Sequence, residues 1–139
     1  DIYPLENTYE KAGAGMFGEL ENPLTEKEFL KMLKEKFNLS VIRHSEFLNK
    51  NIKKVAVCGG SGSFLIKNAV NKGVDAFVTA DIKYHQFFEP EKKFFLTDIG
   101  HYESEKIAIE ILYQLIIKNF TTFAVLKSQT QTNGINYFF

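Results

Sequence analysis

Apolar and polar positions along this chain alternate in blocks that predict strands and helices in turn. From residue 52 onward, three short apolar runs have the length and residue types of buried strands. These runs are residues 55–57, 76–78 and 94–96. Apolar residues at helical spacing separate or follow them, at 64–70 and 103–118. The alternation predicts an α/β fold, with a layered, mostly parallel sheet and helices on both faces.

In the remaining segments, the sequence patterns that predict secondary structure are shorter. Thr25 and Glu28 have the spacing of a capping box, which predicts a helix from Thr25 to near Asn38. Residues 39–43 and 121–126 are typical of strands, and residues 84–88 of a short helix or turn. The stretch "GAGMFGEL" is either a strand with close backbone approach or an irregular loop. The last residues, 128–139, are predicted to be a tail that docks on a neighbour.

Composition limits the classes of function. The 139 residues fit one domain, and a hydrophobic content of 45% suffices for a core. Lys plus Arg equal Asp plus Glu at 17 each, so no net charge attracts nucleic acid or an anionic membrane. A single cysteine, Cys58, excludes an internal disulfide and favours a reducing, cytoplasmic location. No apolar run approaches the roughly 20 residues of a membrane-spanning helix.

Polar residues follow each of the three predicted parallel strands. The first strand ends in "CGGSGS", the second in Thr79 and Asp81, and the third in Thr97, Asp98 and His101. Because the carboxyl ends of parallel strands meet at one edge of a sheet, we expect these clusters to converge there. The glycine-rich segment is either an anion-binding turn or a tight turn with a serine helix cap. Cys58 is expected to be a small buried residue.

Two pairs of candidate residues each have a spacing of four. Asp81 and His85 share a face if their stretch is helical; alternatively, Asp81 is a helix cap and His85 a surface residue. His101 and Glu105 share the first turn of a helix, and imidazole and carboxylate are ordinary ligands of divalent metals. The alternative is that Glu105 and its acidic neighbour simply favour a helix N-terminus. His44 receives no role.

Two blocks of sequence carry a family resemblance. "KVAVCGGSGSFLIKNAVNKGVDAFVTADIKYHQ" and "FFLTDIGHYESE" resemble the C-terminal half of the NIF-three-like family, often labelled GTP cyclohydrolase one type two homologues. The resemblance is closest over residues 53–118. It implies one half of a two-half metal-binding fold, with two divalent ions (zinc, manganese or iron) in the cleft of the full-length protein. It also implies a homo-oligomer, a hexamer in several members.

The resemblance divides the chain and assigns roles. Residues 1–24 are expected to be the exit segment of an inserted domain plus a short strand, and residues 25–139 the C-terminal α/β domain. By position, His101 and Glu105 match metal ligands, and Asp81 and His85 line the same cleft as candidate catalytic groups. The family's Thr-Gly-Asp is replaced here by Thr-Ala-Asp, with Ala80 in the glycine's place.

The extent of the resemblance limits the expected site. The family's other ligands lie in an N-terminal half that this sequence does not contain, so we expect an incomplete metal site and a partner in that missing half. Two functions follow as hypotheses. One is a metal-dependent hydrolase of unknown substrate, and the other is a non-catalytic metal-binding scaffold or regulatory interaction protein.

Overall fold

Three parallel strands form the centre of the fold. The computed structural model describes residues 2–9 and 12–138. In it, β4 (Asn51–Ser61), β5 (Ala76–Ala80) and β6 (Phe95–Asp98) lie side by side, and β5 pairs in parallel with both neighbours. All five residues of β5 and all four of β6 are buried, as expected for strands covered on both faces. The predicted strands at 55–57, 76–78 and 94–96 are therefore confirmed.

Antiparallel strands flank this parallel centre. The order is β1-β2-β4-β5-β6-β3, where β1 is Ile2–Tyr9, β2 is Ala12–Thr25 and β3 is Arg43–His44. Of the five pairings among the described residues, three are antiparallel and two parallel, so the expectation of a mostly parallel sheet is wrong. The connection between β1 and β2 is too short for the crossover that a parallel pair requires.

The segment "GAGMFGEL" is part of β2, so the strand interpretation is correct. Gly15 has a φ of +66°, and a Cβ placed there would lie 3.0 Å from the carbonyl oxygen of Val57. Close backbone approach is thus the reason for a glycine in this strand. Residues 2–9 and 12–25 lie in the same sheet as the rest of the fold, while an inserted domain before them stays a prediction.

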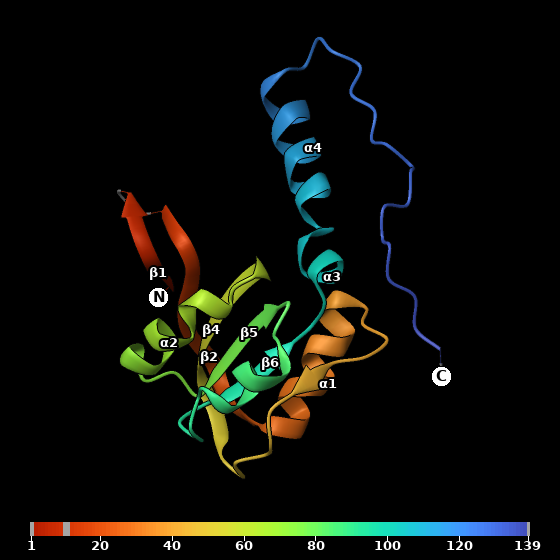
Figure 1. Ribbon diagram of the computed structural model, residues 1–139. Helices are drawn as coiled ribbons and strands as arrows, with labels where there is room; N and C mark the ends of the chain where they lie inside the picture. Colours follow the sequence, from red (N-terminus) through yellow and green to blue (C-terminus); the bar gives the residue numbers. More distant parts are fainter. Residues whose placement is uncertain (1, 10–11, 139) are drawn as a thin grey trace.

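Helices cover both faces of the sheet, as predicted (Figure 1). On one face lies α1 (Glu26–Phe37), which begins at the predicted capping box: the backbone N–H of Glu28 donates to Thr25 Oγ1, and the Glu28 carboxylate accepts from Thr25 N at 2.8 Å. On the other lies α2 (Ile66–Lys72), preceded by the short helix η1 (Ser63–Leu65). Gly73 ends α2 in the left-handed conformation, as its sequence position indicates.

Alternation along the strands supplies the two cores. Ala56, Phe77 and Leu96 face α2, whereas Val55, Val78 and Phe95 pack on the side of α1. Successive side chains of a strand point to opposite faces, so one run of apolar residues fills both layers. Each fully buried Phe or Leu contributes about 1.5–3 kcal/mol. These two layers hold the strand ends, and hence the candidate site, in place.

The chain after β6 departs most from the prediction. Helix is found at α3 (His101–Glu105) and α4 (Ala108–Asn119) instead of one helix over 103–118. Residues 121–126 form a turn and irregular chain, so the strand predicted there is wrong. A strand needs a pairing partner, and this segment pairs with none of the described strands. Figure 1 shows α4 projecting from the body, with the tail running back toward α1.

Two shorter predictions have different outcomes. The strand predicted at 39–43 is wrong in its bounds, because residues 39–42 form irregular chain and the strand found there, β3, shares only Arg43 with the prediction. The short helix predicted at 84–88 is η2 (Tyr84–Phe88).

Candidate functional site

The polar clusters that follow β4, β5 and β6 converge at one edge of the sheet. Asp81 comes directly after β5, and His101 begins α3 three residues after the last residue of β6. Gly60, near the end of β4, contacts α3 through its N–H, which donates to Ser104 Oγ at 2.9 Å. The expected convergence of these strand ends is therefore confirmed.

His101 links two carboxylates at this edge. Its Nδ1 lies 2.6 Å from Asp81 Oδ2, and its Nε2 lies 3.2 Å from Glu105 Oε2. The second contact follows from the spacing of four residues on α3, whereas the first joins two strand ends. The three side chains are about half exposed, at 45%, 48% and 54%, so they are open to a ligand.

The two carboxylates favour the charged imidazole. The hydrogen bond to Asp81 raises the pKa of His101 above its usual 6.5; burial opposes this rise, and the charges of Asp81 and Glu105 add to it. When both ring nitrogens carry protons, each donates to one carboxylate. A metal ion would compete with the proton on Nε2, because metal-binding imidazole must be unprotonated at the ligating nitrogen.

Gly60 leaves room beneath this pair. It has a φ of +61°, and a Cβ there would collide with Glu105 Oε1 and lie 3.2 Å from His101 Nε2. In any residue but glycine, the Cβ would therefore displace the Glu105 carboxylate. Ser104 fixes the approach of the backbone, since its hydroxyl accepts from Gly60 N and donates to the His101 carbonyl oxygen at 2.8 Å.

Asp98 is a residue of this site for which the sequence pattern predicts no role. It is 5% exposed and accepts hydrogen bonds at 3.0 Å from the backbone N–H groups of Ile82 and Gly100. It also pairs with Arg43 at 3.2 Å, while the other guanidinium nitrogen of Arg43 donates to the Ile82 carbonyl. Asp98 thus joins the turn after β5 to the turn after β6. Its place at the end of a buried strand is the one sequence signal for this role.

Asp81 is held in an unusual backbone conformation. Its φ is +57°, a left-handed value that costs a non-glycine residue free energy. The hydrogen bond from the next residue, Ile82 N, to Asp98 holds the turn in that conformation. Strain of this kind is often found where a side chain must be aimed, and here it aims the carboxylate at His101.

His85 lies apart from this arrangement. Because η2 begins only at Tyr84, Asp81 and His85 do not share a helix, and the shared-face interpretation is wrong. His85 is exposed, and within the described part of the chain it has no hydrogen bond or ion pair with Asp81, His101 or Glu105. A catalytic role for His85 stays a prediction.

The glycine-rich segment does not contain the predicted serine cap. β4 continues to Ser61, and Gly62 is the N-cap of η1 with no side-chain hydrogen bond, so that interpretation is wrong, while anion binding by the segment stays a prediction. Cys58 is half-buried; burial raises the pKa of its thiol, and Glu105 raises it further. A raised pKa lowers the thiolate fraction, so Cys58 lacks the character of a reactive cysteine.

The donor set for a metal has two members here. His101 and Glu105 offer a nitrogen and a carboxylate oxygen a few ångströms apart above Gly60, which fits a divalent ion. Among the side chains that the structure describes, no three of His, Cys, Asp or Glu gather closely enough to hold a metal ion. Further ligands would have to come from outside these described side chains.

The sequence matches one family over nearly its whole length. The profile described as Duf34/NIF3 (NGG1p interacting factor 3) matches residues 1–134. This chain belongs to the Duf34/NIF3 family. The resemblance of the strand–turn motifs to that family is thereby confirmed.

Curated Duf34/NIF3 relatives are longer proteins. A protein of Bacillus subtilis named GTP cyclohydrolase 1 type 2 homolog is 35% identical over 142 residues, covering 99% of this chain and 38% of that protein. A Staphylococcus aureus protein of the same name is 37% identical over 111 residues, covering 79% of this chain and 30% of that protein. The chain therefore spans less than two fifths of the length of these relatives.

Solved structures share the fold. A crystal structure of a Staphylococcus aureus protein superposes with a TM-score of 0.82 at 33% identity, covering 91% of this chain and 42% of that one. A Bacillus cereus protein related to NIF3 gives a TM-score of 0.78 at 27% identity, covering 99% and 39%. Among the described residues, none of the helices is long and apolar enough to cross a membrane.

Proposed function

We propose that this chain supplies two ligands, His101 and Glu105, to a divalent metal site that residues outside the chain complete. The observation that carries this proposal is the 3.2 Å separation of His101 Nε2 and Glu105 Oε2 above the space left by Gly60. The side chains are of the types that zinc, manganese and iron accept. In the full-length protein we expect two such ions, with the remaining ligands in its other half.

Asp81 is proposed to position His101. A carboxylate that accepts a hydrogen bond from one ring nitrogen of a histidine fixes the tautomer, so that the other nitrogen carries the lone pair for metal. The 2.6 Å contact between Asp81 Oδ2 and His101 Nδ1 has this arrangement. Asp81 thus serves the site through His101, and His85 is the candidate for direct proton transfer to or from a substrate.

The reaction class proposed is hydrolysis. Divalent ions at such a site lower the pKa of water and polarise a carbonyl or phosphoryl oxygen. In this chain, Asp81 would orient the ligand His101, and Glu105 would lie beside that histidine. One side of the site would stay open to solvent. The curated relatives are named as homologues of a GTP cyclohydrolase, so we propose nucleotides as the first substrate class to screen.

The test uses the full-length protein from which this segment comes. Purified protein is analysed for metal by mass spectrometry and screened for release of phosphate or ring-opened product from nucleotides. We expect Glu105→Gln and His101→Asn to lose metal and turnover. His85→Gln should keep the metal and lose turnover if His85 transfers protons. Full metal content in both ligand variants would contradict the proposal.

A second function is favoured by the exposed apolar surface of α4. Three apolar side chains of this helix are each more than half exposed: Ile109, Leu112 and Leu115. A helix that stays in solvent usually presents polar side chains, so this surface is typical of one that binds a partner. We propose that α4 joins subunits or halves of a homo-oligomeric scaffold, a hexamer by the family expectation. If Glu105→Gln dissolves the assembly and no substrate turns over, the metal is structural and the scaffold function is favoured.

A further inference from the structure

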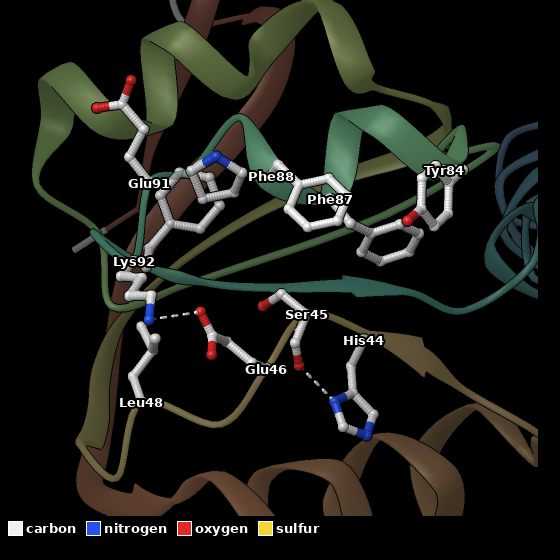
Figure 2. A pocket seen from close by; sticks show the side chains of 11 residues that line it. His44, Ser45, Glu46, Leu48, Tyr84, Phe87, Phe88, Glu91 and Lys92 are labelled. Atoms are coloured by element: carbon white, nitrogen blue, oxygen red, sulfur yellow. Dashed lines mark hydrogen bonds and ion pairs between the residues drawn. The ribbon is translucent and has the colours of Figure 1, made fainter.

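A pocket of about 510 Å³ lies away from the His101 pair, between η2 and the chain that follows β3 (Figure 2). Tyr84, Phe87 and Phe88 come from η2, and His44, Ser45 and Glu46 face them from the other side. The volume is in the range of small-molecule sites, which are mostly apolar with a few polar groups. The pocket has this composition, and its role is independent of any metal.

Aromatic rings form one wall of the pocket. Tyr84 and Phe88 meet edge to face with centroids 5.5 Å apart, and they are 80% and 65% exposed. The Phe87 ring is covered by the Arg43 guanidinium, 5.1 Å from its centroid. Two large rings left open to solvent next to a concave surface favour the stacking of another planar ring.

The opposite wall presents a carboxylate. Glu46 pairs with Lys92 at 3.1 Å through Oε1, and its Oε2 has no hydrogen-bond or ion-pair partner among the described residues. The second acidic group at the rim, Glu91, pairs with Lys93 at 2.8 Å. Because both acids are balanced by lysines, the pocket carries no net charge that would select an ion. The open oxygen of Glu46 instead selects an N–H donor.

The rim that carries Lys92 is set by its backbone. Glu91 and Lys92 have consecutive left-handed φ values of +49° and +60°, an arrangement that costs free energy in non-glycine residues. The turn is closed by hydrogen bonds from Lys93 N to the Pro90 carbonyl and from Glu91 N to the Phe88 carbonyl. This turn holds the Lys92 ammonium against Glu46 and thereby fixes the carboxylate opposite the rings.

We propose that this pocket binds an uncharged planar heteroaromatic ring with N–H donors along one edge, of the amino-purine or pterin type. The ring would stack on Tyr84 and Phe88, and its N–H edge would donate to Glu46. Both recognition elements are needed for this class: a ring without the donor edge stacks but leaves Glu46 unused. A carboxylate acceptor gives stronger hydrogen bonds than a neutral one, so it confers selectivity for the donor edge.

The experiment titrates the 139-residue chain with guanosine and with inosine, which lacks the exocyclic amino group. Binding is followed by calorimetry and by NMR shifts of the tyrosine and phenylalanine ring protons. We expect guanosine to bind at least fivefold more tightly than inosine. Glu46→Gln should lower the affinity for guanosine about tenfold and abolish the preference for guanosine over inosine. The double substitution of Tyr84 and Phe88 by Ala should abolish the binding of both nucleosides.

Glu91→Gln is the matched control, since Glu91 lines the same pocket and is already paired with Lys93. It should leave both affinities within twofold, and circular dichroism should show that every variant is folded. Three outcomes overturn the proposal: no saturable guanosine binding, equal affinity of the two nucleosides, or unchanged guanosine affinity in Glu46→Gln. If apolar peptides shift the ring-proton signals and neither nucleoside does, the pocket is a protein-docking surface instead.

Discussion

The imidazole Nδ1 of His101 lies 2.6 Å from Oδ2 of Asp81, although the two residues are twenty positions apart and follow different strands. Neighbouring parallel strands β5 and β6 place their ends side by side, so the turn after one faces the helix after the other. The left-handed backbone of Asp81 then directs its carboxylate to the ring. This contact decides which nitrogen of His101 is available to a ligand.

Replacing Asp81 by Asn should lower the pKa of His101. The pKa of this imidazole lies above 6.5, chiefly because its hydrogen bond to Asp81 stabilises the charged form. An amide keeps the size of the side chain and removes the charge. In the metal-free chain, NMR titration of the His101 ring protons should show a lower midpoint in Asp81→Asn, while His85→Gln serves as the control. An unchanged midpoint would show that Asp81 does not hold the ring.

The same pair should make stability depend on pH. A histidine with a raised folded-state pKa contributes stability that is fully present below about 6.5 and is lost as the pH rises through the folded-state pKa. The difference in unfolding free energy between the native sequence and Asp81→Asn should therefore be larger at pH 6 than at pH 9. Urea unfolding at the two pH values measures it, and a difference that grows with pH would contradict the argument.

Gly60→Ala should disturb both the fold and the candidate site. An alanine in the left-handed region costs about 1–2 kcal/mol, and here its Cβ also collides with Glu105. Gly73→Ala is a matched control, because Gly73 has the same φ of +61° and nothing lies within 4 Å of an added Cβ. Urea unfolding should show the φ cost in both variants and a further loss only in Gly60→Ala. Equal losses would mean that Glu105 moves aside freely.

Asp98→Ala should be among the most destabilising substitutions near the site. It would leave the buried N–H groups of Ile82 and Gly100 without acceptors, at a total cost on the order of 3 kcal/mol. Glu19→Gln removes only an exposed 3.8 Å contact with Lys53 and should change stability by less than about 0.5 kcal/mol. Thermal or urea unfolding distinguishes the two. A loss in Asp98→Ala as small as that control would show that the two turns do not depend on this carboxylate.

Local signals in the sequence predicted what local physics determines. The capping box of Thr25 and Glu28 involves residues three apart, so the start of α1 could be identified without the fold. The same holds for His101 and Glu105, which one helical turn brings together. The contact of Asp81 with His101 could not be predicted from spacing, because it depends on a left-handed residue and on the register of two strands. Spacing indicated His85 as the partner of Asp81 instead, but η2 begins only at Tyr84, so the two residues do not share a helix.

The strand predicted at residues 121–126 shows the other limit. Its apolar residues have strand-forming character, yet β-structure requires a neighbouring strand with free backbone groups. Phe123 is 66% exposed and Leu126 is 92% exposed; this segment pairs with no described strand, and the Phe123 ring stacks on Phe120 of the same stretch with centroids 5.9 Å apart. A sequence pattern records a propensity for a partner, and the partner need not lie in the same stretch of chain. The prediction of a mostly parallel sheet was wrong for the same reason, since the direction of a strand is defined only relative to the strand with which it pairs.

The exposed helix α4 gives the last prediction. Leu112 and Leu115 are 57% and 52% exposed on a helix that lies away from the body (Figure 1). Apolar surface of this extent tends to associate, so we expect the isolated chain to self-associate through α4. Glu substitutions at both leucines should shift the chain toward monomer in light scattering after size-exclusion chromatography. Lys67→Glu on α2, which changes charge by the same sign on a polar surface, should leave the distribution unchanged. Unaltered self-association in the double variant would assign the contact to another surface.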